Sequence, residues 1–525
     1  MNRLRQSIGF TIVELTVVIA VIGILAAVSA IGWNSWRNSL SEKTVTSDFN
    51  QLLTGMNNYK NFNEGYPILS PNCVFKKSDP SACGVNFFES SDGVTLTYIS
   101  GDGASFCVNG VNASNSSVTF YMTEQGKVKK GTCAGGSSSP DPYSVVASSL
   151  GEYTTCVLAS NNKVYCWGYN GYGQLGNGST TNSSVPVAVV ASGALLGKTI
   201  ESIQLGASST SCVTTSNNRS YCWGLITDGA SESSSNLAPV AVTTNGALSG
   251  KTIKSIYPRG SSTCVVASDD HGYCWGYNGN GQLGNNSTVN SSTPVAVTPG
   301  SPGALAGKTI KAVSGSAAHS CVIASDDLPY CWGYNGYGQL GNGSTTNSNV
   351  PVAVSTGALA GKKVKAISVG GYTSCAIASD DNVYCWGTGG NGTLGNNSSA
   401  NSSVPVAVTT GSPGALAGKT VKSIAVGSNG ACVIASDNLP YCWGLNSRKQ
   451  LGNGTSVTNS LVPVAVTTSG VLSGKTVTSI AAGSSHFCVI GSDKLLYCWG
   501  RGDFGQIGDG STSDAANPVR SNSPY

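Results

Sequence analysis

Cysteine is the residue type of this chain whose spacing most clearly predicts chemistry. The sequence of 525 residues holds 18 cysteines, and fourteen of them form seven pairs whose members lie ten residues apart. Within each pair, alternating apolar residues flank an Asp or Asn turn, which predicts a β-hairpin. Cysteines so placed face each other across the hairpin, within reach of a disulfide. We expect seven disulfides: Cys156–Cys166, Cys212–Cys222, Cys264–Cys274, Cys321–Cys331, Cys375–Cys385, Cys432–Cys442 and Cys488–Cys498.

The other four cysteines precede these pairs, at Cys73, Cys83, Cys107 and Cys133. Sequence alone leaves three pairings open. We expect the economical choice, Cys73–Cys83 and Cys107–Cys133. A four-cysteine metal site fits the spacing but is disfavoured outside the cytoplasm. An even number of cysteines in an exported chain predicts disulfides in an oxidising compartment.

No set of residues predicts catalysis. Of the three histidines, His319 and His486 stand two residues before the first cysteine of a pair, which favours a packing role in the hairpin. A lyase-like active site would need a cluster of His, Tyr or carboxylate residues, and the sequence offers none. Asp pairs such as Asp326-Asp327 fit hairpin turns better than a calcium site. We expect no enzymatic activity, no cofactor and no metal.

A single carboxylate interrupts an apolar segment near the start of the chain. Glu14 is the only charged residue between Arg5 and Arg37, and such a run is long enough to span a bilayer as a helix. Arg3 and Arg5 predict that the short leader stays in the cytoplasm. An unpaired carboxylate there costs roughly 2–3 kcal/mol or more, so Glu14 needs a partner. A cut after Gly9 would create an amino group close to it.

These residues resemble the class III signal of type IV pilins, in which a short basic leader, here residues 1–9, ends in Gly. The resemblance implies cleavage between Gly9 and Phe10 by a prepilin peptidase, and methylation of Phe10. It also implies that Glu14 pairs with the N-terminus of a neighbouring pilin subunit during filament assembly. The precursor would lie in the inner membrane of a bacterium and the mature subunit in an extracellular pilus. The alternatives are a plain membrane anchor or a secretory signal peptide cleaved near Val28-Ser29-Ala30.

We expect one helix over residues 10–62, because apolar residues recur at helical spacing as far as Met56. Its first part, residues 10–31, would be the membrane or filament-core segment. Short β-type runs in residues 63–133 predict a small antiparallel sheet packed on the helix, as in a pilin domain. Residues 134–142, rich in Gly, Ser and Pro, form a linker by composition.

Residues 143–525 repeat seven times with a period of 52 to 57 residues, and each repeat carries Tyr-Cys-Trp-Gly. Two further strands precede each hairpin, one of them Pro-Val-Ala-Val. Four short strands in each of seven repeats predict an all-β, seven-bladed propeller. The first repeat lacks its Pro-Val strand, and we expect Asn517-Pro518-Val519-Arg520 to supply it and so close the ring. The predicted fold class is thus an α+β pilin domain, with a long N-terminal helix and a small antiparallel sheet, followed by this propeller.

The segment from Trp167 to Gly178 and its copies resemble the regulator of chromosome condensation family. Its eukaryotic founder is a nucleotide exchange factor on chromatin, and secreted bacterial relatives bind proteins, including an inhibitor of β-lactamases. Paired cysteines and the N-terminal signal argue against a nuclear role. A formal charge of +4 is too small to argue for nucleic acid. The resemblance therefore implies the architecture and not the exchange activity.

Loops that break the repeat pattern are the expected ligand site, because structural positions of an array recur while a binding surface departs from them. Such departures are residues 225–236 in the second repeat, Arg448 and Lys449 in the sixth, and Arg501 and Phe504 in the seventh. We expect them to contact a surface, glycan or protein.

The expected function is that of a modular subunit of an extracellular type IV pilus, a minor or tip one since a propeller crowds a helical stack. The first alternative is a major pilin with propellers along the filament. The second is a pseudopilin or membrane-tethered propeller that acts as an inhibitor or scaffold.

Overall fold

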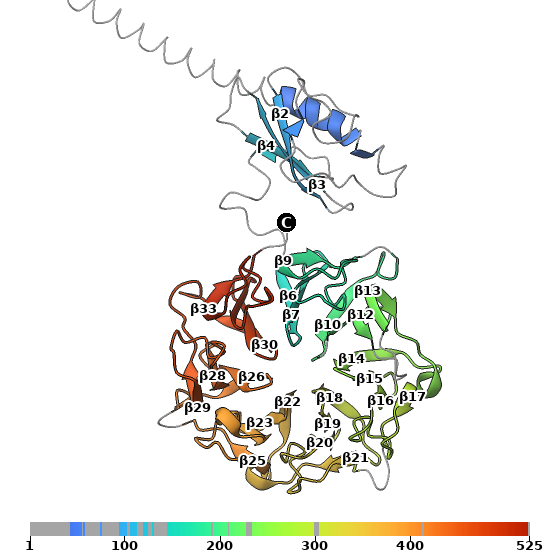
Figure 1. Cartoon of the computed structure of the whole chain (residues 1–525), viewed down its shortest axis with the longest axis vertical. Helices are drawn as coiled ribbons and strands as arrows, with labels where there is room; N and C mark the ends of the chain where they lie inside the picture. The colour runs from blue at the N-terminus through green and yellow to red at the C-terminus, as the bar shows by residue number, and fades with distance from the viewer. Residues whose placement is uncertain are drawn as a thin grey trace, which may run out of the picture. The chain divides into compact units, whose positions relative to one another are not determined.

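A computed structural model of the chain divides into two compact units, Met1–Pro140 and Asp141–Pro524, which are described separately (Figure 1). It describes residues 43–54, 56–57, 74–75, 94–101, 106–112, 119–123, 129–130, 144–190, 193–207, 209–226, 234–298, 304–410 and 414–522.

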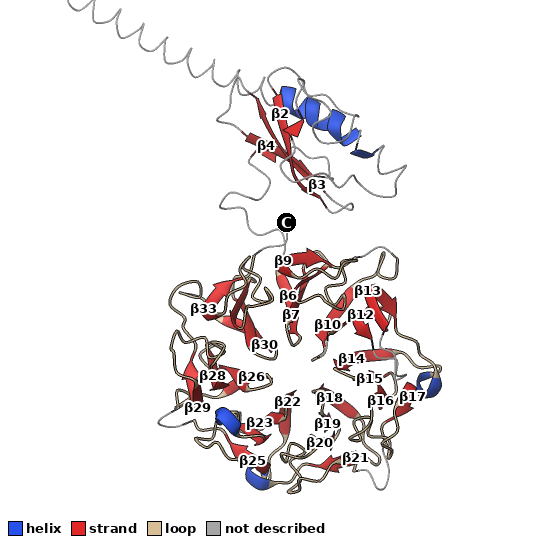
Figure 2. Cartoon of the chain, viewed as in Figure 1, coloured by secondary structure: helices blue, strands red, loops and turns tan. Residues whose placement is uncertain are grey.

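In the described residues of the first unit, a helix packs on a five-stranded antiparallel sheet (Figure 2). The helix is described over residues 43–54 and 56–57. Its side chains Phe49 and Met56 are 0% exposed. A Cβ on Gly110 of the sheet would lie 2.8 Å from the Phe49 ring, so this glycine lets the helix lie close to the strands. The strands, in sheet order, are β1 (Val74–Phe75), β2 (Val94–Gly101), β3 (Phe106–Asn112), β4 (Thr119–Thr123) and β5 (Lys129–Lys130).

The predicted fold class with a long helix over residues 10–62 is wrong. The described residues are nearly all-β, and those of this unit show helix at 43–54 and 56–57. None of the described helices is both long enough and apolar enough to cross a membrane. Helical spacing of apolar residues stabilises a helix where a packing surface is present, and here that surface is the small sheet.

Several predicted residues fall outside the described part of the chain. These are the processing and assembly residues Gly9, Phe10 and Glu14, and three of the first four cysteines, Cys73, Cys83 and Cys133. Cys107 lies in β3, but its side chain is not described. The predicted pairings Cys73–Cys83 and Cys107–Cys133 therefore remain predictions.

The second unit is a ring of seven four-stranded antiparallel sheets, the blades of a propeller (Figure 1). The strands of every blade follow one another in chain order, and short 3-10 turns lie at η2 (Gly246–Leu248), η3 (Gly357–Leu359) and η4 (Gly390–Gly392). The blades are: first, β6 (Val145–Leu150), β7 (Thr154–Ala159), β8 (Val164–Gly168), β9 (Ser183–Ala188); second, β10 (Ile200–Leu205), β11 (Thr210–Thr215), β12 (Arg219–Ile226), β13 (Ser234–Ala241); third, β14 (Ile253–Arg259), β15 (Ser262–Ala267), β16 (Gly272–Gly276), β17 (Ser291–Ala296); fourth, β18 (Ile310–Gly315), β19 (His319–Ala324), β20 (Pro329–Gly333), β21 (Ser348–Ala353); fifth, β22 (Val364–Gly370), β23 (Thr373–Ala378), β24 (Val383–Gly387), β25 (Ser402–Ala407); sixth, β26 (Val421–Val426), β27 (Gly430–Ala435), β28 (Pro440–Leu445), β29 (Asn459–Ala465); seventh, β30 (Val477–Ala482), β31 (His486–Gly491), β32 (Leu496–Gly500), β33 (Ala515–Arg520).

The two middle strands of each blade form the predicted hairpin, and its two cysteines are register partners, as Cys321 and Cys331 are in β19 and β20. All seven disulfides expected in the repeats are present. The third strand ends in a bulge at the glycine of Tyr-Cys-Trp-Gly, where the pairing with the fourth strand shifts between Cys331 and Gly333. Gly333 has a φ of +107°, a conformation that residues with a side chain rarely adopt.

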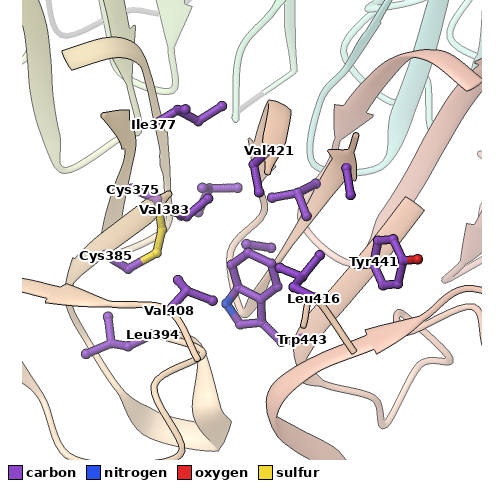
Figure 3. Close-up of a cluster of buried hydrophobic side chains, with 14 residues drawn as sticks. Cys375, Ile377, Val383, Cys385, Leu394, Val408, Leu416, Val421, Tyr441 and Trp443 are labelled. Carbon is purple, nitrogen blue, oxygen red and sulfur yellow. A yellow bond between two sulfur atoms is a disulfide. The ribbon is translucent and has the colours of Figure 1, made fainter. Parts of the chain in front are cut away.

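Neighbouring blades pack through a buried tryptophan. Trp443 of the sixth blade lies in a cluster with Cys385, Leu394 and Leu416 (Figure 3). Its indole Nε1 donates a hydrogen bond of 3.0 Å to the carbonyl of Thr393, in the preceding blade. Trp332 and Trp386 make the same bond to the blade before them. The recurring tryptophan therefore both fills and orients the contact between blades.

The predicted closure of the ring by strand exchange is wrong. The first blade obtains its fourth strand from β9, which contains Pro186, and β33 pairs with β32 of the seventh blade. The Pro-Val strand thus follows its hairpin instead of preceding it. A repeated sequence fits equally well whether the Pro-Val strand is counted first or last in a blade. The outer edge of a blade accepts proline because the missing N–H faces no partner strand.

Candidate binding site on one face of the propeller

The propeller has two chemically distinct faces. In an antiparallel meander, successive connections lie alternately at the two ends of the sheet. The first and third connections of every blade therefore meet on one face, here called the tyrosine face. The second connections and the links between blades meet on the other, here called the lysine face. The tyrosine face carries Tyr153, Tyr169, Tyr172, Tyr277, Tyr334, Tyr337 and Tyr372.

On the lysine face, the Asp pairs have structural partners. Asp326 accepts a hydrogen bond of 2.7 Å from the Tyr330 hydroxyl, and Asp327 forms an ion pair of 2.5 Å with Lys311. Asp327 has a φ of +63°, which completes the hairpin turn. No group of three His, Cys, Asp or Glu side chains suited to a metal occurs in the part of the chain that the structure describes. These carboxylates therefore hold the turns.

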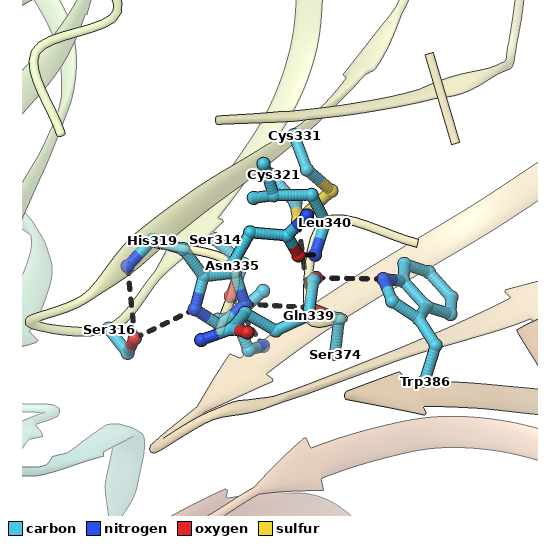
Figure 4. The surroundings of a disulfide bond; sticks show 11 residues. Ser314, Ser316, His319, Cys321, Cys331, Asn335, Gln339, Leu340, Ser374 and Trp386 are labelled. Carbon is cyan, nitrogen blue, oxygen red and sulfur yellow. Dashed lines mark hydrogen bonds between the residues drawn. A yellow bond between two sulfur atoms is a disulfide. The ribbon is translucent and has the colours of Figure 1, made fainter. Parts of the chain in front are cut away.

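The two recurring histidines bridge blades. His319 is buried, and its Nε2 lies 2.7 Å from Ser374 Oγ of the fifth blade (Figure 4). His486 lies 2.9 Å from Thr155 Oγ1, across the junction of the seventh and first blades. Burial, and a nearby arginine in each case, lower the pKa of both imidazoles to about 3. Both rings are therefore neutral at pH 7 and act as hydrogen-bonding links within the core.

An aromatic cluster marks the tyrosine face where the seventh blade meets the first. The Phe504 ring centroid lies 5.0 Å from that of Tyr153 and 5.1 Å from that of Tyr169. The Arg501 guanidinium lies 4.5 Å from the Tyr153 ring centroid, within cation–π range. Together with Tyr172, which is 43% exposed, these side chains form the closure site.

The closure site borders a hollow of about 510 Å³. Three blades contribute to it, because Ser209 and Leu225 of the second blade complete the wall made by the seventh and first. Glu152 also lies at its edge, and burial together with this carboxylate raises the pKa of the Tyr153 hydroxyl. The hollow thus combines aromatic faces, a hydroxyl donor and a carboxylate.

A charged network adjoins the aromatic cluster. Asp503 accepts hydrogen bonds from Arg501 at 2.7 Å and from Arg448 of the sixth blade at 2.5 Å. Arg448 also pairs with Asp514 at 3.3 Å. Burial acts to raise the pKa of Asp503, but the hydrogen bond and charge of Arg501 lower it overall. The network fixes the position of Arg501 against the aromatic rings.

The structure brings together three of the four predicted ligand residues, Arg448, Arg501 and Phe504. Lys449 instead has a φ of +65° in the loop turn, where its N–H donates to the Asn446 carbonyl. Sequence reasoning missed the tyrosines of the first blade. A signal existed, since a tyrosine three residues before the first cysteine occurs only at Tyr153 and Tyr372 among the seven repeats.

A second aromatic group occupies the equivalent place between the fourth and fifth blades. The Tyr372 ring centroid lies 5.6 Å from that of Tyr334 and 5.1 Å from that of Tyr337. Tyr334 stands where Arg501 stands in the seventh repeat. This triad therefore reproduces the ring packing of the closure site without its arginine.

A family model described as an RCC1-like domain matches residues 240–524. The chain belongs to the RCC1-like domain family. Models of the regulator of chromosome condensation (RCC1) repeat also match residues 161–213 and 145–174. The predicted propeller of RCC1-like repeats is thereby confirmed.

Curated relatives share this domain. The ultraviolet-B receptor UVR8 of Arabidopsis thaliana is 29% identical over 381 residues, covering 72% of this chain and 81% of the receptor. The E3 ubiquitin-protein ligase HERC2 of Homo sapiens is 29% identical over 371 residues, covering 69% of this chain but 7% of the ligase. Because so little of the ligase is matched, the likeness concerns the matched segment alone.

Solved structures agree on the fold. Human WBSCR16 has a TM-score of 0.59 at 20% identity, covering 69% of this chain and 94% of that chain. Yeast RCC1 (Prp20), solved with Kap60 bound, has a TM-score of 0.58 at 17% identity, covering 75% and 90%. At these identities the RCC1-like members share the architecture with this chain, and its binding chemistry rests on its own side chains.

Proposed function

We propose that this chain is a subunit of an extracellular type IV pilus whose RCC1-like propeller binds a protein partner through the closure site. The proposed binding of a protein partner rests on the hollow of about 510 Å³ between the seventh, first and second blades. Part of its wall comes from a loop that departs from the repeat at Phe504, whereas Tyr169 and Tyr172 belong to the repeated segment. Aromatic and arginine side chains of this kind dominate the binding energy of protein interfaces.

The family supports a protein as the partner. The solved yeast relative is described as bound to Kap60, and a second study of Prp20p from Saccharomyces cerevisiae concerns its binding to Gsp1p and histones. Those partners belong to the yeast protein. The closure site favours a polypeptide with an apolar or aromatic anchor for the hollow and polar groups for Glu152 and the Tyr153 hydroxyl.

Signs that the chain is exported support the proposed role as a pilus subunit. Fourteen buried cysteines joined in seven bridges are typical of a protein that matures in an oxidising compartment. The residues before and after Gly9 supply the class III signal, with Glu14 as the assembly residue. On this proposal the precursor enters the inner membrane, loses its leader, and joins other pilin subunits as a minor or tip component.

The pilus half is tested with Glu14→Ala in the producing cell. We expect the variant to be exported with its disulfides formed but absent from sheared pili. Immunogold labelling of wild-type pili would then distinguish a tip subunit from a major one. Absence of both wild type and variant from sheared fibres, with equal amounts of the two in the membrane fraction, would instead favour a membrane-tethered propeller that acts as an inhibitor or scaffold.

The binding half is tested by photo-crosslinking from position 172 on the full chain and by affinity measurements on the captured protein. Phe504→Ala and Tyr153→Ala should weaken binding at least about tenfold, because each removes one wall of the hollow. Tyr337→Ala, in the equivalent triad between the fourth and fifth blades, is the matched control and should bind normally. Equal losses in all three variants, or binding only to a glycan array, would contradict a protein partner at this site.

A further inference from the structure

One position in the first connection of each blade accepts almost no side chain. It is glycine in five repeats, and at Gly370 a Cβ would lie 2.3 Å from the carbonyl oxygen of Val426 in the next blade. The fourth repeat has Ser316 there, and the third has Arg259. The other five positions are Gly151, Gly206, Gly370, Gly427 and Gly483.

The fourth blade contains a complementary change. Its strand β18 ends in Gly315, whereas the residues at the same place in the other repeats are Leu150, Leu205, Pro258, Val369, Val426 and Ala482. A Cβ on Gly315 would lie 2.5 Å from Arg259 Nε. The arginine of the third blade therefore occupies space that a larger side chain fills in other blades. At this one junction, Arg259 is larger and Gly315 is smaller than the residues at the same places in most other repeats, and the two changes compensate in volume.

The Arg259 guanidinium is buried over the Trp332 ring, 6.0 Å from the ring centroid, and lacks a hydrogen-bond partner among the described residues. Its side chain is 1% exposed, and Nε, Nη1 and Nη2 form no hydrogen bond to any described residue. Two hydroxyls beside it are also unpartnered, those of Ser262 and Ser320. Ser262 is the register partner of Arg259, and Ser320 is the register partner of Gly315, so the three polar groups meet in the junction.

The next junction shows how such groups are normally satisfied. Between the fourth and fifth blades, Ser374 Oγ lies 2.7 Å from His319 Nε2 and donates to the Gln339 carbonyl at 3.0 Å (Figure 4). Between the third and fourth blades, no described carboxylate or carbonyl accepts from Arg259. The Gln282 carbonyl at this junction accepts from Trp332 Nε1, and the described residues give Arg259 no counter-ion, an arrangement that a bound anion would stabilise.

We propose that Arg259, Ser262 and Ser320 form a buried site for a small monovalent inorganic anion such as chloride, which links the third and fourth blades. The guanidinium supplies the charge and a fork of N–H donors, and the two hydroxyls supply further donors. Arg259 remains protonated at neutral pH, since burial lowers its pKa only to about 9. The site is independent of the pilus and of the closure site.

The test measures the melting temperature of the full chain while chloride replaces gluconate at constant ionic strength. The wild type should melt at progressively higher temperature as chloride rises, because the anion binds only the folded state. Arg259→Gly combined with Gly315→Val restores the residues of other repeats and should lose this dependence. Arg219→Gly, at an exposed arginine, is the matched control and should keep it.

A chloride dependence identical in wild type and the double variant would overturn the proposal. Crystals of the wild type grown in bromide provide a measurement that does not depend on the variant folding. An anomalous peak within hydrogen-bond distance of the Arg259 guanidinium is expected, and water alone at that place would refute the anion site.

Discussion

Histidine at the blade junctions shows how one substitution in a repeat changes the chemistry of a fold. His319 and His486 stand at a position where the other repeats have threonine, serine or glycine. The longer side chain reaches a hydroxyl of the next blade, at Ser374 and Thr155 respectively. A protonated ring in this buried place would lack an anionic partner. The fold therefore depends on the neutral form of both residues.

This dependence predicts a loss of stability in weak acid. The pKa of each ring is about 3 in the folded chain and near 6.5 when unfolded, so the unfolded state binds protons more readily as pH falls below about 6.5. Above that pH, the stabilising contribution of the two neutral histidines is fully present. Below it, the free energy of unfolding falls toward pH 3 by about 1.4 kcal/mol per pH unit for each histidine. Urea unfolding between pH 6.5 and 4.5 measures the slope.

The variant His319→Gln should reduce this slope by one histidine's share, because an amide cannot be protonated. Burial acts to raise the pKa values of Asp269 and Asp380, but their hydrogen bonds, with Tyr273 and Tyr384 respectively, lower them overall. These carboxylates therefore lose their stabilising contribution only as pH falls below their usual range. An unaltered slope in His319→Gln would show that the ring is not buried neutral.

Among the elements, the disulfide-bonded hairpin is the unit from which each blade is built. In the fifth blade, Cys375 and Cys385 pair in register between β23 and β24, and both lie in the cluster around Trp443 (Figure 3). The bridge joins strands that already share a backbone ladder. Its contribution therefore comes mainly from restricting the unfolded chain.

Removing one bridge should weaken the propeller without changing its shape. Cys375→Ala with Cys385→Ala is expected to lower the free energy of unfolding by about 2–3 kcal/mol, the chain-entropy value for a short loop, plus the loss of two buried sulfur atoms. Chemical denaturation under non-reducing conditions measures it. Unchanged stability would mean that the hairpin is equally constrained in the unfolded chain.

At the scale of the whole molecule, a repeated sequence predicts some levels of structure and not others. The spacing of Cys321 and Cys331 was sufficient for the hairpin and its bridge, since both depend on local geometry. The repeat was not sufficient to predict which four strands make up one blade. The strand that contains Pro186 fits the first or the fourth place, and only contacts distant in sequence decide between them. The closure site was found in part: Arg501 and Phe504 break the pattern, whereas Tyr169 follows the pattern and is recognised only by its ring contact with Phe504.

Closure of the ring is the property that most clearly belongs to the whole molecule. The first and seventh blades exchange no strand, and their junction repeats the contacts of the others. Trp167 Nε1 donates to the Gln506 carbonyl at 3.0 Å, just as Trp386 donates to that of Gln339 at 3.0 Å. The chain therefore closes on itself through side-chain packing and hydrogen bonds between blades, including one of 2.8 Å from the Val145 N–H to the Lys494 carbonyl, and without an exchanged strand.

If closure is equivalent to an internal junction, mutation at either place should cost the same. Trp167→Ala and Trp386→Ala are each expected to lower the free energy of unfolding by about 3–5 kcal/mol, the usual range for a fully buried tryptophan. Their effects are compared in parallel denaturant titrations, with limited proteolysis to detect an opened ring. A much smaller cost for Trp167→Ala, accompanied by cleavage in the first blade, would show that the closing junction is weaker than the rest and that the ring opens there.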